Sequence, residues 1–378
     1  MGPAAASSAL RTTNPVRVAR EVGTTAAKVH RPSGGLVFVA GTVAGRISEL
    51  SHDLATAGLG IPLLVVPGAG VLTEQGEIER DSAASTIVWG GGRARAVALP
   101  GPSVDQASEQ LASILSGRGQ GPASAVAVFL PPAGLQPDSL SPLCHVAGSG
   151  HIFGAGTVGD TELVAVDEEG STETGPAAAM IISGLSPPIV SSSPACRLLT
   201  PLLPITETDG PLVLKIGEHK ALDLLNSVGS KLANKQLLLT VLAGDEAEES
   251  PPPLLVRGIR GVDPLRGAML VSPEARPGVK MALAVRDASA ARSDLQRATR
   301  QTQRAVAGAA PRFGLYLDCA GRGSALYSTP DVDTRILRSA FGEVPFAGMH
   351  SSFEIVNVSG RPTLQLYSGV VALFTSPS

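Results

Sequence analysis

One arginine of this chain lies in a turn suited to binding an anion. Gly321 and Gly323 flank Arg322 in the sequence Cys-Ala-Gly-Arg-Gly. Glycine lets the backbone turn sharply and approach a ligand closely, and arginine offers a planar fork of donors that matches a carboxylate or a phosphate. We therefore predict that Arg322 and the glycine amides beside it bind a ligand carboxylate. A buried structural arginine that pairs with Asp318 or with an exposed carbonyl is the alternative.

Three more polar residues are candidates for the same binding site. Glu77 follows the glycine-rich stretch 68–70, and Glu354 follows Gly348 by six residues. A carboxylate can receive the amino group of a ligand, so with Arg322 these acids would clamp a zwitterion. His350 also falls beside this strand end. A salt bridge at the end of a sheet is the structural alternative for the two glutamates.

Cys319 is a candidate nucleophile in this region. A thiol becomes reactive when nearby cations lower its pKa, and Arg322 and His350 would do this for Cys319. A free cysteine at a strand end more often packs as a small apolar side chain. We therefore expect no enzymatic activity and assign Cys319 to the ligand site.

No metal or cofactor is expected from the sequence. Three cysteines, at positions 144, 196 and 319, form none of the closely spaced pairs of a zinc site. Their odd number and wide spacing also argue against a disulfide framework and favour a reducing compartment, so we expect a cytoplasmic protein. Residues 154–159 formally match a dinucleotide fingerprint, but a strand pattern follows them where that motif needs a helix.

The strands and the helix predicted around Arg322 indicate how the candidate binding residues are positioned. An apolar run at 313–317 has the length and composition of a strand. Thr329-Pro330 is typical of a helix start, and apolar residues at helical spacing continue to Phe341, before Gly342. A second short strand is predicted at 344–348. The candidate residues thus lie at strand ends, where proteins of this class often bind small molecules.

Strands outnumber helices along the rest of the chain. Residues 85–89 and 94–99 predict a hairpin around three glycines at 90–92. Several other strands are joined by short turns. We therefore predict an α+β fold with largely antiparallel sheets and packed helices, a layered α/β sandwich.

Two segments of the chain repeat the same order of features. Val66-Pro-Gly-Ala-Gly precedes a Glu-Ile pair, as Val344-Pro-Phe-Ala-Gly does, and a strand, a glycine turn and a helix precede each. We predict two related halves. At 378 residues two domains are the natural expectation. Their predicted ranges are 16–210 and 211–378, after a disordered tail at 1–15.

Composition excludes several classes of function. The net charge is −3 and aromatic residues make up 3% of the chain, whereas nucleic-acid binding needs a basic surface and usually aromatic platforms. The longest apolar runs, such as 177–182 and 237–243, are too short to span a membrane. We expect neither a nucleic-acid partner nor a membrane span.

Several short stretches follow the pattern of one known family. They are 255–259 (LVRGI), 267–271 (GAMLV), 319–323 (CAGRG) and 341–348 (FGEVPFAG). In this order they resemble the C-terminal module of the FIST family, named for F-box and intracellular signal transduction. More loosely, 70–73 with 76–79, and later 154–160, resemble the N-terminal FIST module. The predicted domains 16–210 and 211–378 would correspond to the two modules.

The resemblance implies a sensory protein that binds a small ligand, such as an amino acid. No output domain is recognised in the chain, so the signal would pass to a downstream signalling protein in trans. Met349 and Phe353 stand where the family pattern has an aromatic residue and a glycine. The second hypothesis is therefore a protein-interaction adaptor with a vestigial pocket, and the third is an enzyme that uses Cys319.

Overall fold

The computed structural model describes residues 2–117, 123–136, 138–146, 151–159, 161–230, 232, 237–243, 254–306, 308–358 and 360–376. The chain forms two compact units. The first comprises Met1–Ser193, Leu295–Leu364 and Ser368–Ser378, and the second comprises Pro194–Asp294 and Gln365–Tyr367. The second unit is therefore inserted into the first, and these bounds differ from the predicted consecutive domains 16–210 and 211–378.

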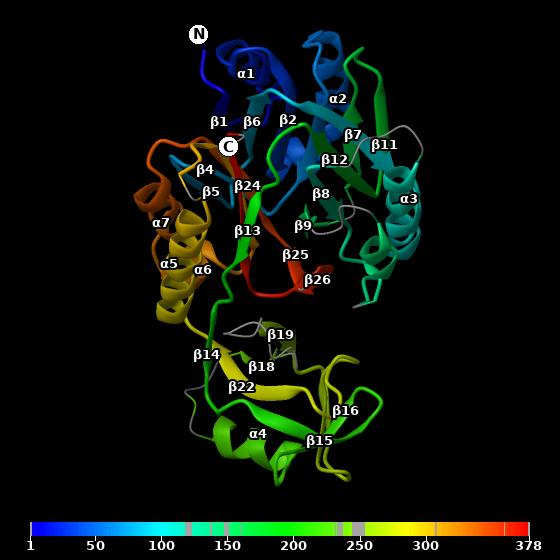
Figure 1. Cartoon of the computed structure of the whole chain (residues 1–378), viewed down its shortest axis with the longest axis vertical. Helices are drawn as coiled ribbons and strands as arrows, with labels where there is room; N and C mark the ends of the chain where they lie inside the picture. Colours follow the sequence, from blue (N-terminus) through cyan, green and yellow to red (C-terminus); the bar gives the residue numbers. More distant parts are fainter. Residues whose placement is uncertain are drawn as a thin grey trace. The chain divides into compact units, whose positions relative to one another are not determined.

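Three six-stranded sheets build the first unit (Figure 1). The β2 sheet has the order β1 (Ala5–Arg11), β6 (Ala83–Gly90), β2 (Pro32–Ala40), β3 (Leu63–Pro67), β10 (Leu163–Val166), β11 (Thr172–Gly175). The β8 sheet has the order β26 (Arg361–Gln365), β25 (Glu354–Val358), β9 (Ile152–Gly156), β8 (Ala125–Leu130), β12 (Ala177–Ser183), β7 (Arg93–Leu99). The β23 sheet has the order β13 (Ile189–Ser192), β27 (Gly369–Thr375), β23 (Pro311–Cys319), β24 (Phe346–Ser351), β4 (Gly70–Thr73), β5 (Gly76–Glu79).

The three sheets repeat one topology. Each has a central parallel pair, β2–β3, β8–β9 or β23–β24, with antiparallel neighbours on both sides. The two strands that follow each pair in the chain join a different sheet: β4 and β5 join the β23 sheet, β10 and β11 the β2 sheet, and β25 and β26 the β8 sheet. The predicted internal repeat therefore exists, but it occurs three times instead of twice.

The two Pro-x-Ala-Gly stretches that suggested the repeat do not occupy equivalent positions in the β2 and β23 sheets. Pro67 ends β3, whereas Pro345 precedes β24, the strand that corresponds to β3 in the β23 sheet. The order of strand, helix and strand was correct, but the two Pro-x-Ala-Gly stretches occupy different places. Proline and glycine are frequent at both the start and the end of strands, so they do not define a register.

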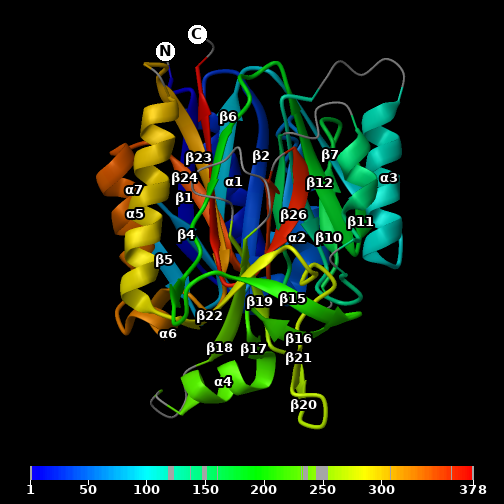
Figure 2. The same cartoon turned by 60° about the horizontal axis from the view of Figure 1, so that its bottom comes forward.

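The helices of the first unit cover the outer faces of these sheets. They are α1 (Pro15–Lys28), η1 (Gly41–Arg46), α2 (Ile47–Thr56), α3 (Val104–Ser116), η2 (Ser141–His145), α6 (Gly323–Tyr327), α7 (Val332–Phe341) and, from Leu295 on, α5 (Ala288–Ala305). Figures 1 and 2 show α1 and α2 beside the β2 sheet, α3 beside the β8 sheet, and α5 and α7 beside the β23 sheet. Among the described residues, no helix is both long and apolar enough to cross a membrane.

Alternating side chains of the strands face either a shared core or the helices. Leu36, Phe38 and Ala40 of β2 belong to the core that all three sheets share, whereas Val37 and Val39 pack with α1 and α2. This alternation is the period-2 pattern of a strand that is buried on both faces.

Aromatic pairs connect the three sheets in the shared core. Phe313 of β23 stacks on Trp89 of β6, with ring centroids 5.2 Å apart. Phe38 of β2 meets Phe129 of β8 edge to face at 5.9 Å. Since these rings come from all three sheets, one central hydrophobic core joins the three sheets, and the first unit does not consist of two facing halves. The predicted α+β class with packed helices and mostly antiparallel pairing is confirmed.

The second unit is one antiparallel sheet with a helix packed on it. Its path is β19 (Leu254–Gly258), β18 (Leu238–Ala243), β22 (Lys280–Arg286), β15 (Leu203–Asp209), β16 (Leu212–Ile216), β21 (Ala268–Leu270), β20 (Gly261–Asp263), with β14 (Cys196–Leu198) on β22 and β17 (His219–Lys220) on β16. The helix α4 (Ala221–Gly229) contributes Leu224, Leu225 and Val228 to the core of this unit.

Two local predictions are wrong. The tail 1–15 was expected to be disordered, but β1 pairs with β6 along its whole length and α1 begins at Pro15. The predicted hairpin around Gly90–Gly92 does not form, because β6 belongs to the β2 sheet and β7 to the β8 sheet. The positive φ angles of Gly91 and Gly92 let the chain cross from one sheet to the other.

Candidate functional site

Four residues lie on one register line across the β23 sheet. Asp318 of β23 is paired with His350 of β24, His350 with Gly70 of β4, and Gly70 with Glu79 of β5. Side chains on such a line project from the same face of the sheet. A Cβ on Gly70 would lie 2.6 Å from Cδ2 of His350. The glycine therefore makes room for the imidazole beside Glu79.

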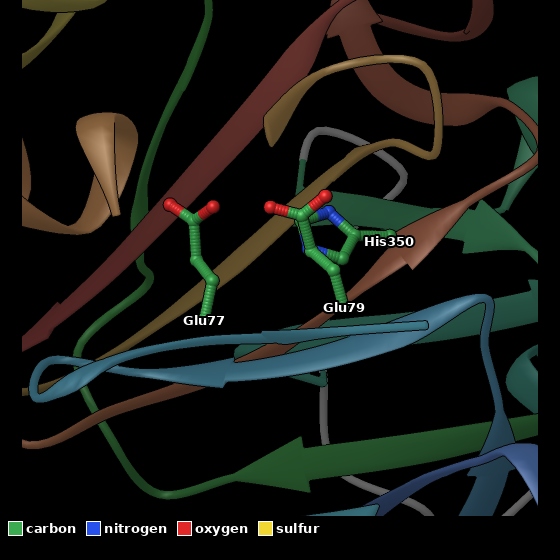
Figure 3. A group of neighbouring side chains, drawn as sticks. All are labelled: Glu77, Glu79 and His350. Carbon is green, nitrogen blue, oxygen red and sulfur yellow. The ribbon is translucent and has the colours of Figure 1, made fainter. Parts of the chain in front are cut away.

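Glu77 completes the cluster, because residues two apart on a strand share a face. Figure 3 shows that Glu77 and Glu79 rise from the same side of the β4–β5 hairpin, with His350 beside Glu79. One ligand atom from each of the three side chains lies within 4.8 Å of the other two. Glu77 and His350 are buried, and Glu79 is half-buried. We call Glu77, Glu79 and His350 the β5–β24 cluster.

The elements around the cluster hydrogen-bond each of its three side chains. Nδ1 of His350 lies 2.7 Å from Oδ1 of Asp318. The Ser324 amide and hydroxyl of α6 donate to the Glu79 carboxylate over 2.8 and 2.6 Å. Oε1 of Glu77 accepts from the amide and hydroxyl of Thr334 in α7, both at 3.3 Å. The three side chains are thus oriented before any ligand arrives.

Three polar side-chain atoms in this region have no protein partner. Nε2 of His350, Oε2 of Glu77 and Oδ2 of Asp318 are buried and make no hydrogen bond. Buried polar atoms are nearly always hydrogen-bonded, so three unpaired atoms in one place mark a site that an ion, a water or a ligand would satisfy.

The cluster carries an excess of buried acids. Burial, together with the nearby Asp318, raises the pKa of Glu77 to about 7. Burial opposes the imidazolium of His350, but the Asp318 carboxylate outweighs this and raises the pKa of His350 to about 9. The region therefore stabilises a positive charge and opposes a negative one.

Arg322 does not face this cluster with a free guanidinium. Its side chain is fully buried, and its Nε donates to Oδ2 of Asp333 over 2.7 Å. Nη1 donates to the Ser193 carbonyl at 3.0 Å, and Nη2 donates to Tyr327 Oη at 3.0 Å. The predicted ligand contact through Arg322 is therefore replaced by an internal ion pair. The partner is Asp333, and not Asp318 as the structural alternative proposed.

The other residues of the predicted turn are structural neighbours of this ion pair. Cys319 pairs in register with Ser351 and not with His350, so the strand alternation directs it to the opposite face from Asp318. The Gly321 amide donates to Sγ of Cys319 at 3.4 Å. Gly323 has a positive φ, and a Cβ there would lie 2.7 Å from Oε1 of Glu79. Of these residues, Gly323 contributes to the cluster by admitting the Glu79 carboxylate.

Glu354 lies apart from the predicted clamp. Its carboxyl is fully buried, and Oε2 accepts from the amide and hydroxyl of Ser368 at 3.1 and 2.6 Å. The Ser351 hydroxyl lies 2.8 Å from both Oε1 of Glu354 and the Asp318 carbonyl oxygen. One hydroxyl proton cannot serve two acceptors, so both contacts become hydrogen bonds when the carboxyl of Glu354 holds a proton. Burial raises the pKa of Glu354 to about 8, in agreement with this geometry.

The protonated Glu354 carboxyl predicts a specific pH dependence of stability. Its pKa in the folded chain is above the ordinary value of 4.5, so its stabilising contribution is complete below pH 4.5 and is lost as the pH rises toward 8. We expect Glu354→Gln to be well tolerated, because an amide reproduces the donor and the acceptor. In urea unfolding between pH 5 and 8, the free energy of unfolding should fall less steeply with pH in this variant than in the wild type. The difference in slope should be on the order of 1 kcal/mol per pH unit.

The control for this prediction is Glu343→Gln, since the Glu343 side chain is 74% exposed. This variant should keep the pH dependence of the wild-type protein. A Glu354→Gln protein as steeply pH-dependent as the wild type would show that Glu354 is ionised in the folded chain.

Sequence reasoning named Glu77 and His350 but missed two residues beside them. Glu79 is visible in the sequence, because the Glu-x-Glu spacing on a strand puts both acids on one face. Asp318 carried no such signal, because its partner His350 is 32 residues away. No residue of the chain was predicted from its sequence to bind a metal.

The family comparison matches the C-terminal part of the chain. Residues 221–357 match the FIST C domain, from the start of α4 into β25. The resemblance to the C-terminal FIST module is thereby confirmed.

Curated relatives are mycobacterial. An uncharacterized protein of Mycobacterium tuberculosis is 27% identical over 190 residues, which are 48% of this chain and 49% of that protein. An uncharacterized protein of Mycobacterium bovis is 27% identical over 195 residues, 50% of each chain. The alignments thus span about half the length of these relatives.

One solved structure matches weakly. It is phosphoribosylformylglycinamidine synthase II of Thermotoga maritima, at 10% identity and a TM-score of 0.22, covering 98% of this chain and 72% of that one. Likeness at this level carries no inference about fold or function.

Proposed function

Because this chain carries a FIST C domain, we propose that it is a sensory protein of a signal transduction pathway that binds a small, positively charged ligand. The ligand site is the β5–β24 cluster, and a downstream protein in trans reads the bound state. The observation that carries this proposal is the convergence of unpaired buried atoms of Glu77 and His350 beside the half-buried carboxylate of Glu79.

The position of the cluster supports a binding role. Asp318 and His350 lie at the carboxyl ends of the parallel strands β23 and β24. Ligands of open sheets with parallel strands commonly bind at that end, because the loops there leave side chains free to face a ligand. The short helices α6 and α7 supply hydrogen bonds that hold the acids in position.

The charge of the site decides what kind of ligand it fits. Glu77, Glu79 and Asp318 lie around a single histidine, so the acidic groups outnumber the one cation even when His350 is protonated, and the site disfavours an anionic ligand. Arg322, which was predicted to bind a ligand carboxylate, instead forms an ion pair with Asp333. An amino-acid-like ligand would therefore bind through its ammonium group, and a free amine should bind as well as the amino acid.

A thermal-shift panel in the presence of EDTA tests this proposal. It compares amino acids, their amides, the corresponding amines and simple carboxylates. We expect amines and amides to raise the melting temperature by roughly 5 °C at about 100 times their Kd, because bound ligand then adds about 2.7 kcal/mol. Carboxylates without an amine should give no shift.

Two glutamine variants make the test specific. Glu79→Gln removes a half-buried charge from the cluster and should abolish the shift, whereas Glu354→Gln should keep it. A panel in which no compound shifts the wild type, or in which carboxylates shift it as much as amines, contradicts the proposal. Recovery of one partner protein without any ligand effect would instead favour the adaptor.

A further inference from the structure

We propose that the β5–β24 cluster is a binding site for a divalent transition-metal ion, held by Glu77, Glu79 and His350. This inference deepens the proposed function and rests on it, since it concerns the same site and names a cation that would occupy it. Among the described residues, this is the group of histidine and acidic side chains that lie close enough together to share an ion.

The unpaired atoms supply the first argument. His350 is 4% exposed and its Nε2 has no partner. Glu77 is 8% exposed and its Oε2 has none either. The cluster atoms lie within 4.8 Å of one another. Metal–ligand bonds of about 2.0–2.2 Å put the ligands of a tetrahedral ion roughly 3.4 Å apart. Small rotations about the glutamate side-chain bonds would bring the three atoms onto one ion.

The outer contacts supply the second argument. A histidine that binds a metal through one nitrogen usually donates its other N–H to a carboxylate, which fixes the tautomer and the ring orientation. Asp318 provides this contact to His350 at 2.7 Å. The glutamates have equivalent support, because Ser324 binds Glu79 and Thr334 binds Glu77. All three ligands are therefore oriented as metal ligands are.

The donor set indicates which ions fit. One imidazole and two carboxylates suit zinc, manganese, iron, cobalt or nickel, whereas calcium and magnesium prefer oxygen ligands alone. Three protein ligands leave at least one position of the ion for water or for a small ligand. Of the three ligands, Glu79 is the least buried.

Metal titration of the 378-residue chain tests the inference. The protein is stripped with EDTA, freed of chelator and titrated calorimetrically with zinc chloride and with manganese chloride. We expect one ion per chain for at least one metal, checked by elemental analysis after gel filtration. Cobalt chloride should give visible absorption bands that report the coordination of the ion in the same site.

Variants distinguish this site from binding elsewhere. Glu77→Gln, Glu79→Gln and His350→Gln should each weaken the affinity more than about 100-fold, since even the loss of an outer partner costs about 10–100-fold. Asp318→Asn should weaken the metal affinity by about 10–100-fold, because Asp318 positions the imidazole of His350 and does not itself bind the ion. Glu354→Gln makes the same chemical change at a buried glutamate outside the cluster and should bind as the wild type does.

The experiments distinguish the failure of the metal site from the failure of the proposed binding of a cationic ligand. Wild-type protein that binds neither metal, or cluster variants that bind as tightly as the wild type, overturn the metal site. If amines still raise the melting temperature in EDTA, the cationic-ligand function remains. Should a buried variant unfold, Glu79→Gln decides the matter, because Glu79 is only half-buried.

Discussion

Replacing Arg322 with methionine should destabilise the protein by about 3–5 kcal/mol, because it leaves a buried charge without its partner. The side chains of Arg322 and Asp333 are 0% and 1% exposed. Tyr316 and Tyr327 also donate to the Asp333 carboxylate, at 2.8 and 2.7 Å. Those two hydrogen bonds cannot replace a guanidinium, so the remaining carboxylate would have to take up a proton or draw in water. Urea unfolding at neutral pH measures the loss.

An exposed ion pair provides the matched control. Arg338 and Glu343 lie 3.3 Å apart with side chains 50% and 74% exposed. Arg338→Met should therefore cost no more than about 1 kcal/mol. The double variant Arg322→Met with Asp333→Asn should be less destabilised than the sum of the two single variants, because it removes both charges. An Arg322→Met protein as stable as the wild type would restore Arg322 as a candidate ligand contact.

Replacing Gly348 with alanine should destabilise the first unit by at least about 3 kcal/mol. A Cβ at this position would lie 1.6 Å from the carbonyl oxygen of Tyr316, its register partner on β23. The obstacle is backbone and not a movable side chain, so β24 would have to separate from β23, at a cost above the usual 1–3 kcal/mol of overpacking. These two strands carry Asp318 and His350, so the separation would also disrupt the β5–β24 cluster.

Gly45→Ala is the control for this effect. No atom lies within 4 Å of a Cβ placed on Gly45. We expect this variant to be as stable as the wild type, or slightly more stable, because alanine has fewer conformations to lose on folding. Circular dichroism and urea unfolding of both variants measure the difference. Equal midpoints for Gly348→Ala and the wild type would contradict the close approach of β24 to β23.

Local sequence determined most of the individual elements. The apolar run beginning at Phe313 lies in β23, and the helix predicted to end at Phe341 is α7, with Gly342 at a positive φ after it. Such elements depend on side-chain periodicity and on residues with special backbone preferences. Both signals are contained in the short stretch of sequence that forms the element. The N-cap differed, because Asp331 holds that position in place of Thr329. Helix ends are the least certain part of such predictions.

Strand pairing could not be predicted in the same way. The hairpin β4–β5 lies next to β24, although the register partners Thr73 and Ala347 are 274 residues apart, counting from 73 to 347. A period-2 pattern shows that a strand has two faces, but it does not identify the neighbouring strand. The same limit explains the missing hairpin at Gly90–Gly92 and the third repeat that the sequence analysis did not find.

The sequence by itself determined which side chains can bind a ligand and which local turns hold them. Arg322 between its glycines, Glu77 and His350 were all recognised in this way. Only the tertiary structure decided their roles. Asp333 neutralises Arg322 in the interior, whereas register pairing across four strands brings Asp318, His350 and Glu79 into line. The physical reason is that charge pairing and desolvation depend on distances through space, and those distances are set by strand neighbours far apart in the chain.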